Sequence, residues 1–145
     1  MRIASRVMAM PDRIQTRLPV IGAFAAGAVS AGCEPVFLPT TTETGFLPDL
    51  DALTPELLSR TVAFFIASPA NPQGAVADAA YLAKAVALAR KYNFMLFSDE
   101  CYSELYYGAP PASMLTAAGP DYENVVIFQS LSKRSNLPGL RVGFA

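Results

Sequence analysis

Lys133 occupies a position that does not suit a surface lysine. It follows the apolar run VVIFQSL and precedes a Gly/Pro-rich segment, in the stretch SLSKRSNLPGLRVGF. The other two lysines, Lys84 and Lys91, lie one heptad apart on an amphipathic helical pattern, where a solvated face explains them. An amine at the end of a buried strand suits covalent chemistry with a carbonyl compound.

Polar side chains follow two further apolar runs. The run VAFFIA leads into SPANPQG, which contains Asn71, and the run FMLF leads into SDECYSELYYG, which contains Asp99 and Tyr102. In an open parallel α/β sheet the ligand binds at the carboxyl ends of the strands, so we expect these groups to meet Lys133 there. Strand alternation turns Glu100 away from Asp99, so we do not expect the two to form an acid/base dyad.

The groups at this edge match the chemistry of pyridoxal 5′-phosphate, which has a cationic ring nitrogen, a phenolate, a carbonyl and a phosphate. We expect Lys133 to form the Schiff base, Asp99 to keep the pyridine nitrogen protonated, and Arg141 to bind the phosphate in a forked contact. Each residue alone also has a structural explanation. Asp99 suits a helix cap or turn, Tyr102 a rim aromatic, and Asn71 a simple Asn-Pro turn. The prediction therefore rests on the combination.

Composition excludes several other kinds of protein. The chain has 145 residues, of which 52% are hydrophobic and 16% charged, as expected of one globular domain. A net charge of −1 without a basic stripe argues against nucleic acid as a partner. The absence of histidine removes the usual triad base and metal ligand, and Cys33 and Cys101 are too far apart for a zinc site. We expect both cysteines to be small buried groups in a reducing cytoplasm, without a disulfide.

The N-terminal region has two interpretations. Residues 1–20 are basic and lead into LPVIGAFAAGAVSAGC, which has the parts of a signal peptide with a lipoprotein-like cysteine. The alternative is a helix over residues 22–32, closed by Gly32, and then a strand over residues 33–39. We favour the helix because Ser30 stands where a lipoprotein site prefers leucine and because glycines weaken the apolar run. No segment is apolar over the roughly 18 residues that a membrane span needs, so we expect no membrane partner.

Helical and strand patterns alternate along the rest of the chain. We expect helices over residues 54–59 and 78–92, the second capped by Asp78, and strands over residues 62–67, 94–97 and 125–131. This alternation predicts an α/β fold, a three-layer α-β-α arrangement around a mostly parallel sheet.

Three motifs resemble, in residue sequence and in order along the chain, those of the fold-type I, class I and II aminotransferases that use pyridoxal phosphate. They are SPANPQG, SDECYSELYYG and FQSLSKRSNLPGLRVGF. The surrounding sequence is most similar to the subgroup that acts on N-succinyldiaminopimelate in bacterial lysine biosynthesis. The resemblance implies three catalytic residues: Lys133, Asp99 and Tyr102. It implies cofactor contacts from Asn71, Asp99, Tyr102, Ser130, Ser132, Lys133 and Arg141. It implies no metal.

The resemblance also implies the substrates, the cellular location, the oligomeric state and the domain organisation. Enzymes of this family transfer an amino group from an amino acid to a 2-oxo acid, work in the cytoplasm and form homodimers. Residues 21–145 would be a partial, truncated cofactor-binding large domain, with residues 1–20 outside the resemblance. The family's upstream phosphate loop, ring-stacking aromatic and substrate-binding small domain are not found in this sequence. We therefore expect an internal fragment of an aminotransferase. The alternative is a non-catalytic fragment that retains at most weak pyridoxal phosphate binding.

Overall fold

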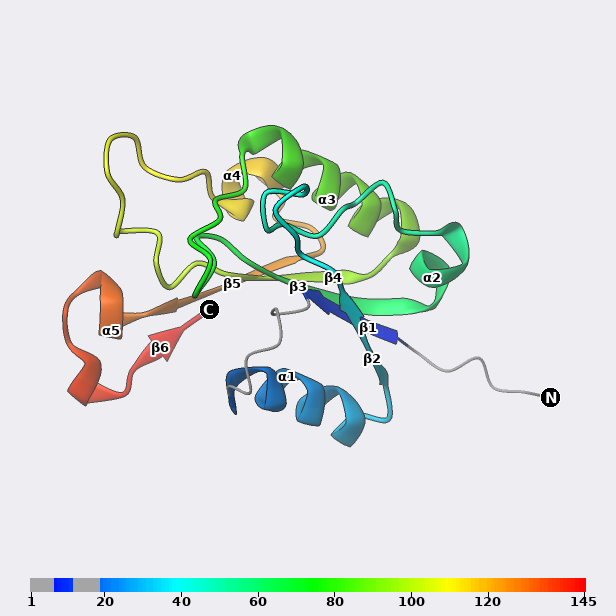
Figure 1. Ribbon diagram of the computed structural model, residues 1–145, viewed down its shortest axis with the longest axis horizontal. Coiled ribbons are helices and arrows are strands. Elements are labelled where there is room, and N and C mark those ends of the chain that lie inside the picture. The colour runs from blue at the N-terminus through cyan, green and yellow to red at the C-terminus, as the bar shows by residue number, and fades with distance from the viewer. Residues whose placement is uncertain (1–6, 12–18) are drawn as a thin grey trace.

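The computed structural model describes residues 7–11 and 19–145, which form one six-stranded sheet flanked by helices (Figure 1). The strands are β1 (Val7–Pro11), β2 (Glu34–Leu38), β3 (Thr61–Ala67), β4 (Met95–Asp99), β5 (Val125–Ser130) and β6 (Gly143–Phe144). The helices are α1 (Pro19–Ser30), α2 (Pro55–Arg60), α3 (Ala79–Tyr92), α4 (Met114–Ala118), α5 (Leu131–Arg134) and the 3₁₀ helix η1 (Pro138–Leu140).

The sheet has the order β2-β1-β3-β4-β5-β6. The first five strands pair in parallel, and β6 pairs antiparallel to β5. Helices α2, α3 and α4 lie on one face of the sheet, and α1 lies on the other (Figure 1). The predicted α/β fold with a mostly parallel sheet is confirmed.

The main core lies between the sheet and α3. Alternate residues of β3 and β4, including Phe64, Ile66 and Leu96, are almost fully buried, and Leu82 and Val86 of α3 join the same cluster. The residues between them turn to the opposite face. There the rings of Phe65 and Phe97 lie 4.8 Å apart, and those of Phe97 and Phe128 lie 5.8 Å apart. The sheet is thus apolar on both faces, as expected of parallel strands between helical layers.

Local signals explain where α3 begins and ends. Asp78 caps the helix by accepting a hydrogen bond from Tyr81 N at 2.7 Å, and Asn93 ends it in the left-handed conformation with φ 55°. The expected helix over residues 78–92 is confirmed. At the other end of the chain, α1 and β2 confirm the expected helix and strand on either side of Gly32, whose φ is 71°.

Strand β1 differs from what the sequence pattern predicts. The sequence pattern did not identify a strand within residues 1–20, but β1 pairs with both β2 and β3. Val7 is fully buried and Ala9 is 3% exposed, so the run VMAMP acquires its strand structure from two neighbours that lie far along the chain. The basic residues on which the signal-peptide interpretation depends lie outside the described residues: Arg2, Arg6, Arg13 and Arg17.

The two cysteines are free, as expected, but both are partly exposed rather than buried. Cys33 lies just before β2, and Cys101 lies in the turn that follows β4, so neither enters the core. Within residues 7–11 and 19–145, no helix combines the length and the apolar character needed to cross a membrane.

Candidate active site

The loops after β3, β4 and β5 leave the sheet at one edge. Ala67 pairs with Asp99 in the register of β3 and β4, and Asp99 pairs with Phe128 of β5. Two backbone hydrogen bonds of 3.0 Å extend this alignment past the strands, from Ser68 N to Asp99 O and from Glu100 N to Phe128 O. The three predicted motifs therefore begin side by side, as the strand pattern implied.

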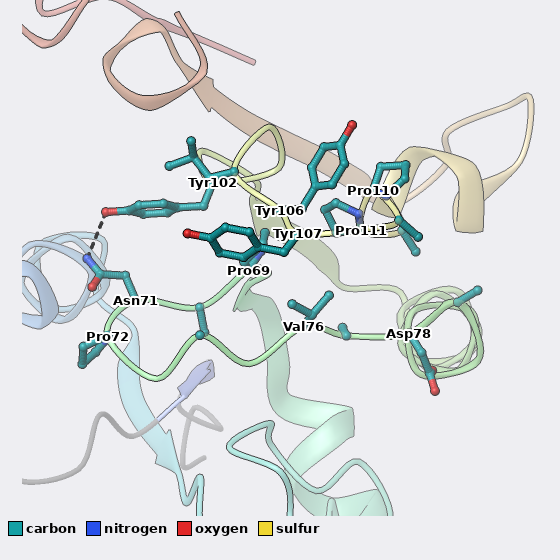
Figure 2. A pocket seen from close by; sticks show the side chains of 17 residues that line it. Pro69, Asn71, Pro72, Val76, Asp78, Tyr102, Tyr106, Tyr107, Pro110 and Pro111 are labelled. Atoms are coloured by element: carbon teal, nitrogen blue, oxygen red, sulfur yellow. Dashed lines mark hydrogen bonds between the residues drawn. The ribbon is translucent and has the colours of Figure 1, made fainter. Parts of the chain in front are cut away.

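Asn71 and Tyr102 make a direct contact across two of these loops. Asn71 Nδ2 donates a hydrogen bond to Tyr102 Oη at 3.2 Å, which is the dashed line in Figure 2. The base of the Asn71 loop is closed by a buried bond of 3.0 Å from Ala77 N to Ser68 Oγ. Gly74 has φ 72°, a conformation that favours glycine, and its N–H donates to Ala70 O at 2.7 Å. The loop is thus a compact unit that presents the amide to the phenol.

Lys133 lies beside the same phenol ring. Its Nζ is 5.6 Å from the centroid of Tyr102, within the range of a cation–π contact. The segment after β5 forms the one-turn helix α5, so the strand that we expected to run to residue 131 ends at Ser130. Ser130 begins this turn by accepting a hydrogen bond from Ser132 N at 3.1 Å. Three of the predicted site residues, Asn71, Tyr102 and Lys133, are thereby brought together.

Asp99 is the last residue of β4 and lies at the same edge. Its Oδ1 accepts a hydrogen bond of 3.1 Å from Cys101 N, so the carboxylate also organises the turn that carries Tyr102. Burial, and then the hydrogen bond and negative charge of Asp99, raise the pKa of the Cys101 thiol to about 12. Cys101 is consequently a neutral thiol near pH 7, which makes it a poor nucleophile.

Glu100 is a buried carboxylate with a different set of partners. It is 3% exposed and accepts hydrogen bonds from Met114 N at 2.8 Å, Ser113 Oγ at 2.9 Å and Ser98 Oγ at 3.2 Å. These contacts hold the start of α4 against the end of β4. Glu100 therefore closes the base of the loop over residues 101–112, on which Tyr102 lies.

Arg141 is less closely connected to the other site residues. It follows η1 with φ 52°, and its Nη1 donates to Pro138 O at 3.1 Å. In the described part of the chain, no hydrogen bond or ion pair joins it to Lys133, Asp99 or Tyr102. Ser130 Oγ contacts the same segment at Val142 O, 3.4 Å away. The predicted phosphate-binding groups thus lie within residues 130–141, and Ser130 contacts the residue after Arg141.

A cavity of about 770 Å³ lies between the loop after β3 and the loop after β4 (Figure 2). Asn71 and Tyr102 line one part of it, whereas Lys133, Asp99 and Arg141 do not line it. Its other walls are rich in proline and aromatic side chains, including Pro69, Pro110, Pro111, Tyr106 and Tyr107. Sequence reasoning did not single out Tyr106 and Tyr107, although the YYG end of the second motif was a visible signal.

The sequence of this chain is similar to those of known aminotransferases. A family model described as "Aminotransferase class I and II" matches residues 3–145, so the match includes most of the first 20 residues. An LL-diaminopimelate aminotransferase of Syntrophobacter fumaroxidans is 38% identical over 128 residues, which are 88% of this chain and 33% of that protein. Transaminase BacF of Bacillus subtilis is 36% identical over 122 residues, which are 84% of this chain and 30% of that protein.

Solved structures of aminotransferases share the fold. Aminotransferase AspB from Helicobacter pylori has a TM-score of 0.83 and 34% identity, and the match covers 96% of this chain and 36% of that chain. A probable N-succinyldiaminopimelate aminotransferase from Thermus thermophilus has a TM-score of 0.81 and 30% identity, and the match covers 96% of this chain and 35% of that chain. The chain spans about a third of the length of these relatives. The sequence match over nearly the whole chain and the shared fold agree: this protein belongs to the class I and II aminotransferase family.

Proposed function

We propose that this chain is part of a pyridoxal-phosphate-dependent aminotransferase, in which residues 21–145 form a portion of the large cofactor-binding domain. One observation carries the proposal. The Tyr102 phenol is hydrogen-bonded to Asn71 at 3.2 Å, and its ring lies 5.6 Å from the Lys133 amine. An amide, a phenol and an amine from the segments after three strands therefore converge at the edge where ligands bind in this architecture.

The chemistry of the side chains fits the cofactor. Lys133 is exposed and offers an amine, and Asn71 and Tyr102 offer donors for an anionic ring oxygen. Asp99 offers a carboxylate for a cationic ring nitrogen. A phosphate needs several donors, and the guanidinium of Arg141 uses one N–H on Pro138 O and retains the others. The hydroxyls of Ser130 and Ser132 lie on the same segment as Arg141.

Each of these residues would have a distinct task. Pyridoxal phosphate, when bound, supplies an electron-withdrawing ring that stabilises negative charge at the substrate Cα. Lys133 would hold the cofactor covalently and, as a free amine, would carry the proton from that carbon to the carbonyl-derived carbon of the cofactor. Asp99 would keep the ring nitrogen protonated. Tyr102 and Asn71 would orient the ring through its oxygen, and Ser130, Ser132 and Arg141 would hold the phosphate.

For substrates we propose an amino acid and a 2-oxo acid. N-succinyldiaminopimelate and LL-diaminopimelate are the first candidates to assay, because relatives of this chain carry these substrates in their names. We also propose a cytoplasmic location, which the two free cysteines support, and a homodimer for the full-length enzyme. The second candidate is a non-catalytic chain with weak cofactor binding, which is favoured by the absence of Lys133, Asp99 and Arg141 from the lining of the cavity of about 770 Å³.

Borohydride trapping with pyridoxal phosphate, followed by peptide mapping, tests the proposal. We expect the reduced label on Lys133, because its amine lies beside Tyr102 at the candidate site, whereas Lys84 and Lys91 lie on α3. The variant Lys133→Arg keeps the charge and should lose the label. Equal labelling of all three lysines would contradict the proposal. A coupled assay with glutamate as amino donor then separates a transaminase from the non-catalytic alternative.

A further inference from the structure

A side-chain hydrogen bond joins the turn that carries Tyr102 to the segment that carries Lys133. Gln129 Nε2 donates to Ser103 Oγ at 3.1 Å. Ser103 directly follows Tyr102, and Gln129 directly precedes Ser130, where the Lys133 segment begins. The bond therefore spans the two halves of the candidate site, although neither of its residues belongs to the expected cofactor contacts.

Gln129 also has an unpaired atom. Within the described residues, its Oε1 is buried and has no hydrogen-bond partner. Flipping the Gln129 amide, so that Oε1 and Nε2 exchange places, still leaves one buried atom unpaired. The Ser103 hydroxyl would then donate to the oxygen, and the amide nitrogen would have no acceptor. An apolar side chain would avoid the unpaired buried atom. The stability of the fold therefore does not explain an amide at this position.

Other contacts of the turn make Ser103 a suitable anchor. Ser103 N donates to Glu100 O and Leu105 N donates to Tyr102 O, both at 3.0 Å, so the turn is compact and Ser103 moves together with Tyr102. A second bridge, between Arg134 Nε and Glu104 Oε1, is 3.8 Å long, and both side chains are nearly half exposed. Such an exposed pair contributes little. Gln129 thus provides the stronger connection.

We propose that Gln129 is a positioning residue that holds the Tyr102 turn against β5 and so keeps the phenol beside the Lys133 amine. This inference rests on the proposed function. Without the hydrogen bond, the only side-chain contact left between the turn and β5 in the described residues is the weak one from Cys101 Sγ to Phe128 O at 3.9 Å, so the phenol spends less time next to Lys133. Covalent capture of pyridoxal phosphate should then weaken, while the fold itself remains stable.

The variants Gln129→Leu, Ser103→Ala and the double variant test this role in the full 145-residue chain. Glu104→Gln is the matched control, because it removes the exposed bridge between the same two segments. Three quantities are measured: the apparent affinity for pyridoxal phosphate, the borohydride-trapped label on Lys133 at subsaturating cofactor, and the thermal midpoint. The first two report on positioning, and the third reports on structure alone.

We expect Gln129→Leu and Ser103→Ala each to weaken cofactor affinity by about five- to tenfold, the effect of one lost hydrogen bond. The double variant should be no weaker than either single variant, because both remove the same bond. The thermal midpoint of Gln129→Leu should be unchanged or raised, and Glu104→Gln should match the wild type in all three measurements.

Two results would overturn the inference. If affinity is unchanged in both single variants, or falls only in proportion to the thermal midpoint, Gln129 has no positioning role. A Gln129→Leu protein that fails to fold also contradicts the expectation of unchanged stability, and Ser103→Ala then shows whether the bond itself affects capture. Failure of the wild type to label Lys133 rejects the proposed function as well, whereas normal wild-type labelling with unaffected variants rejects this inference alone.

Discussion

Asp99 and Glu100 are consecutive residues whose carboxylates bind different parts of the molecule. Asp99 Oδ1 accepts from Cys101 N at 3.1 Å, in the turn that carries Tyr102, whereas Glu100 Oε1 accepts from Met114 N at 2.8 Å, at the start of α4. Glu100 is almost fully buried and Asp99 is not. Two acidic groups at the end of one strand thus have separate tasks, one at the candidate site and one in the packing beneath it.

Replacing Glu100 should destabilise the fold. Glu100→Ala leaves the partly buried Ser113 hydroxyl and the buried Met114 amide without their acceptor, so we expect a loss of about 3 kcal/mol in the free energy of unfolding. Urea denaturation monitored by circular dichroism measures this loss. Glu104→Gln, an exposed acidic position in the same loop, should change the free energy by no more than about 0.5 kcal/mol. Equal effects at the two positions would show that the Glu100 contacts contribute little.

Replacing Asp99 should make the Cys101 thiol more acidic. Asp99→Asn removes a negative charge beside the thiol, so the pKa of Cys101 should fall from about 12 toward its ordinary value, while burial keeps it above that value. Alkylation by iodoacetamide, mapped to Cys101 at several pH values, should begin at lower pH in the variant. Cys33 provides the internal control. Identical profiles for wild type and variant would mean that Asp99 does not act on this thiol.

The raised thiol pKa also predicts how stability depends on pH. Cys101 ionises near pH 9 in the unfolded chain and near pH 12 in the folded chain. Between these two pH values the thiol keeps its proton only in the folded state. This contribution to stability is fully present below pH 9 and is lost as the pH rises through the folded value. Cys101→Ser should therefore reduce the alkaline slope of the free energy of unfolding. The same slope in both proteins would assign it to other groups.

Gly143 should tolerate no side chain. A Cβ atom there would lie 2.9 Å from Gln129 O, whereas a Cβ atom at Gly139 would meet nothing within 4 Å. Gly143→Ala should thus push β6 away from β5, at a cost of about 1–3 kcal/mol, and Gly139→Ala should be nearly neutral. Hydrogen exchange of the Leu131 amide, which donates to Val142 O at 3.1 Å, measures the separation. Unchanged protection in Gly143→Ala would contradict this expectation.

The isolated chain should associate in solution. Four large apolar side chains near its end, Leu137, Leu140, Val142 and Phe144, are each 44–59% exposed. Exposed apolar groups gathered on one short segment favour association over a free monomer. We expect sedimentation at low micromolar concentration to show dimers or soluble aggregates. A homogeneous monomer would contradict this expectation, and turnover of about 1 s⁻¹ or more by that monomer would also reject the non-catalytic alternative.

Local sequence determined most of the architecture. The helix over residues 78–92 was predictable because its cap and its periodic apolar face are encoded within one short segment. The strands that end in the three motifs were predictable for the same reason, since a buried parallel strand needs a continuous apolar run. Once those strands are parallel, the common edge of Asn71, Asp99 and Lys133 follows from the geometry of the sheet.

Tertiary structure decided the features that depend on distant partners. Strand β1 carries no strong strand signal of its own, and it forms because Val7 pairs with both Glu34 and Thr61. The bond between Gln129 and Ser103 likewise requires β5 to lie beside β4, and neither residue type indicates it. A hydrogen bond or a strand pairing across 25 or more residues is set by the packing of whole elements. Such packing produces no recognisable pattern in a short stretch of sequence, whereas helix caps, apolar periodicity and motifs do.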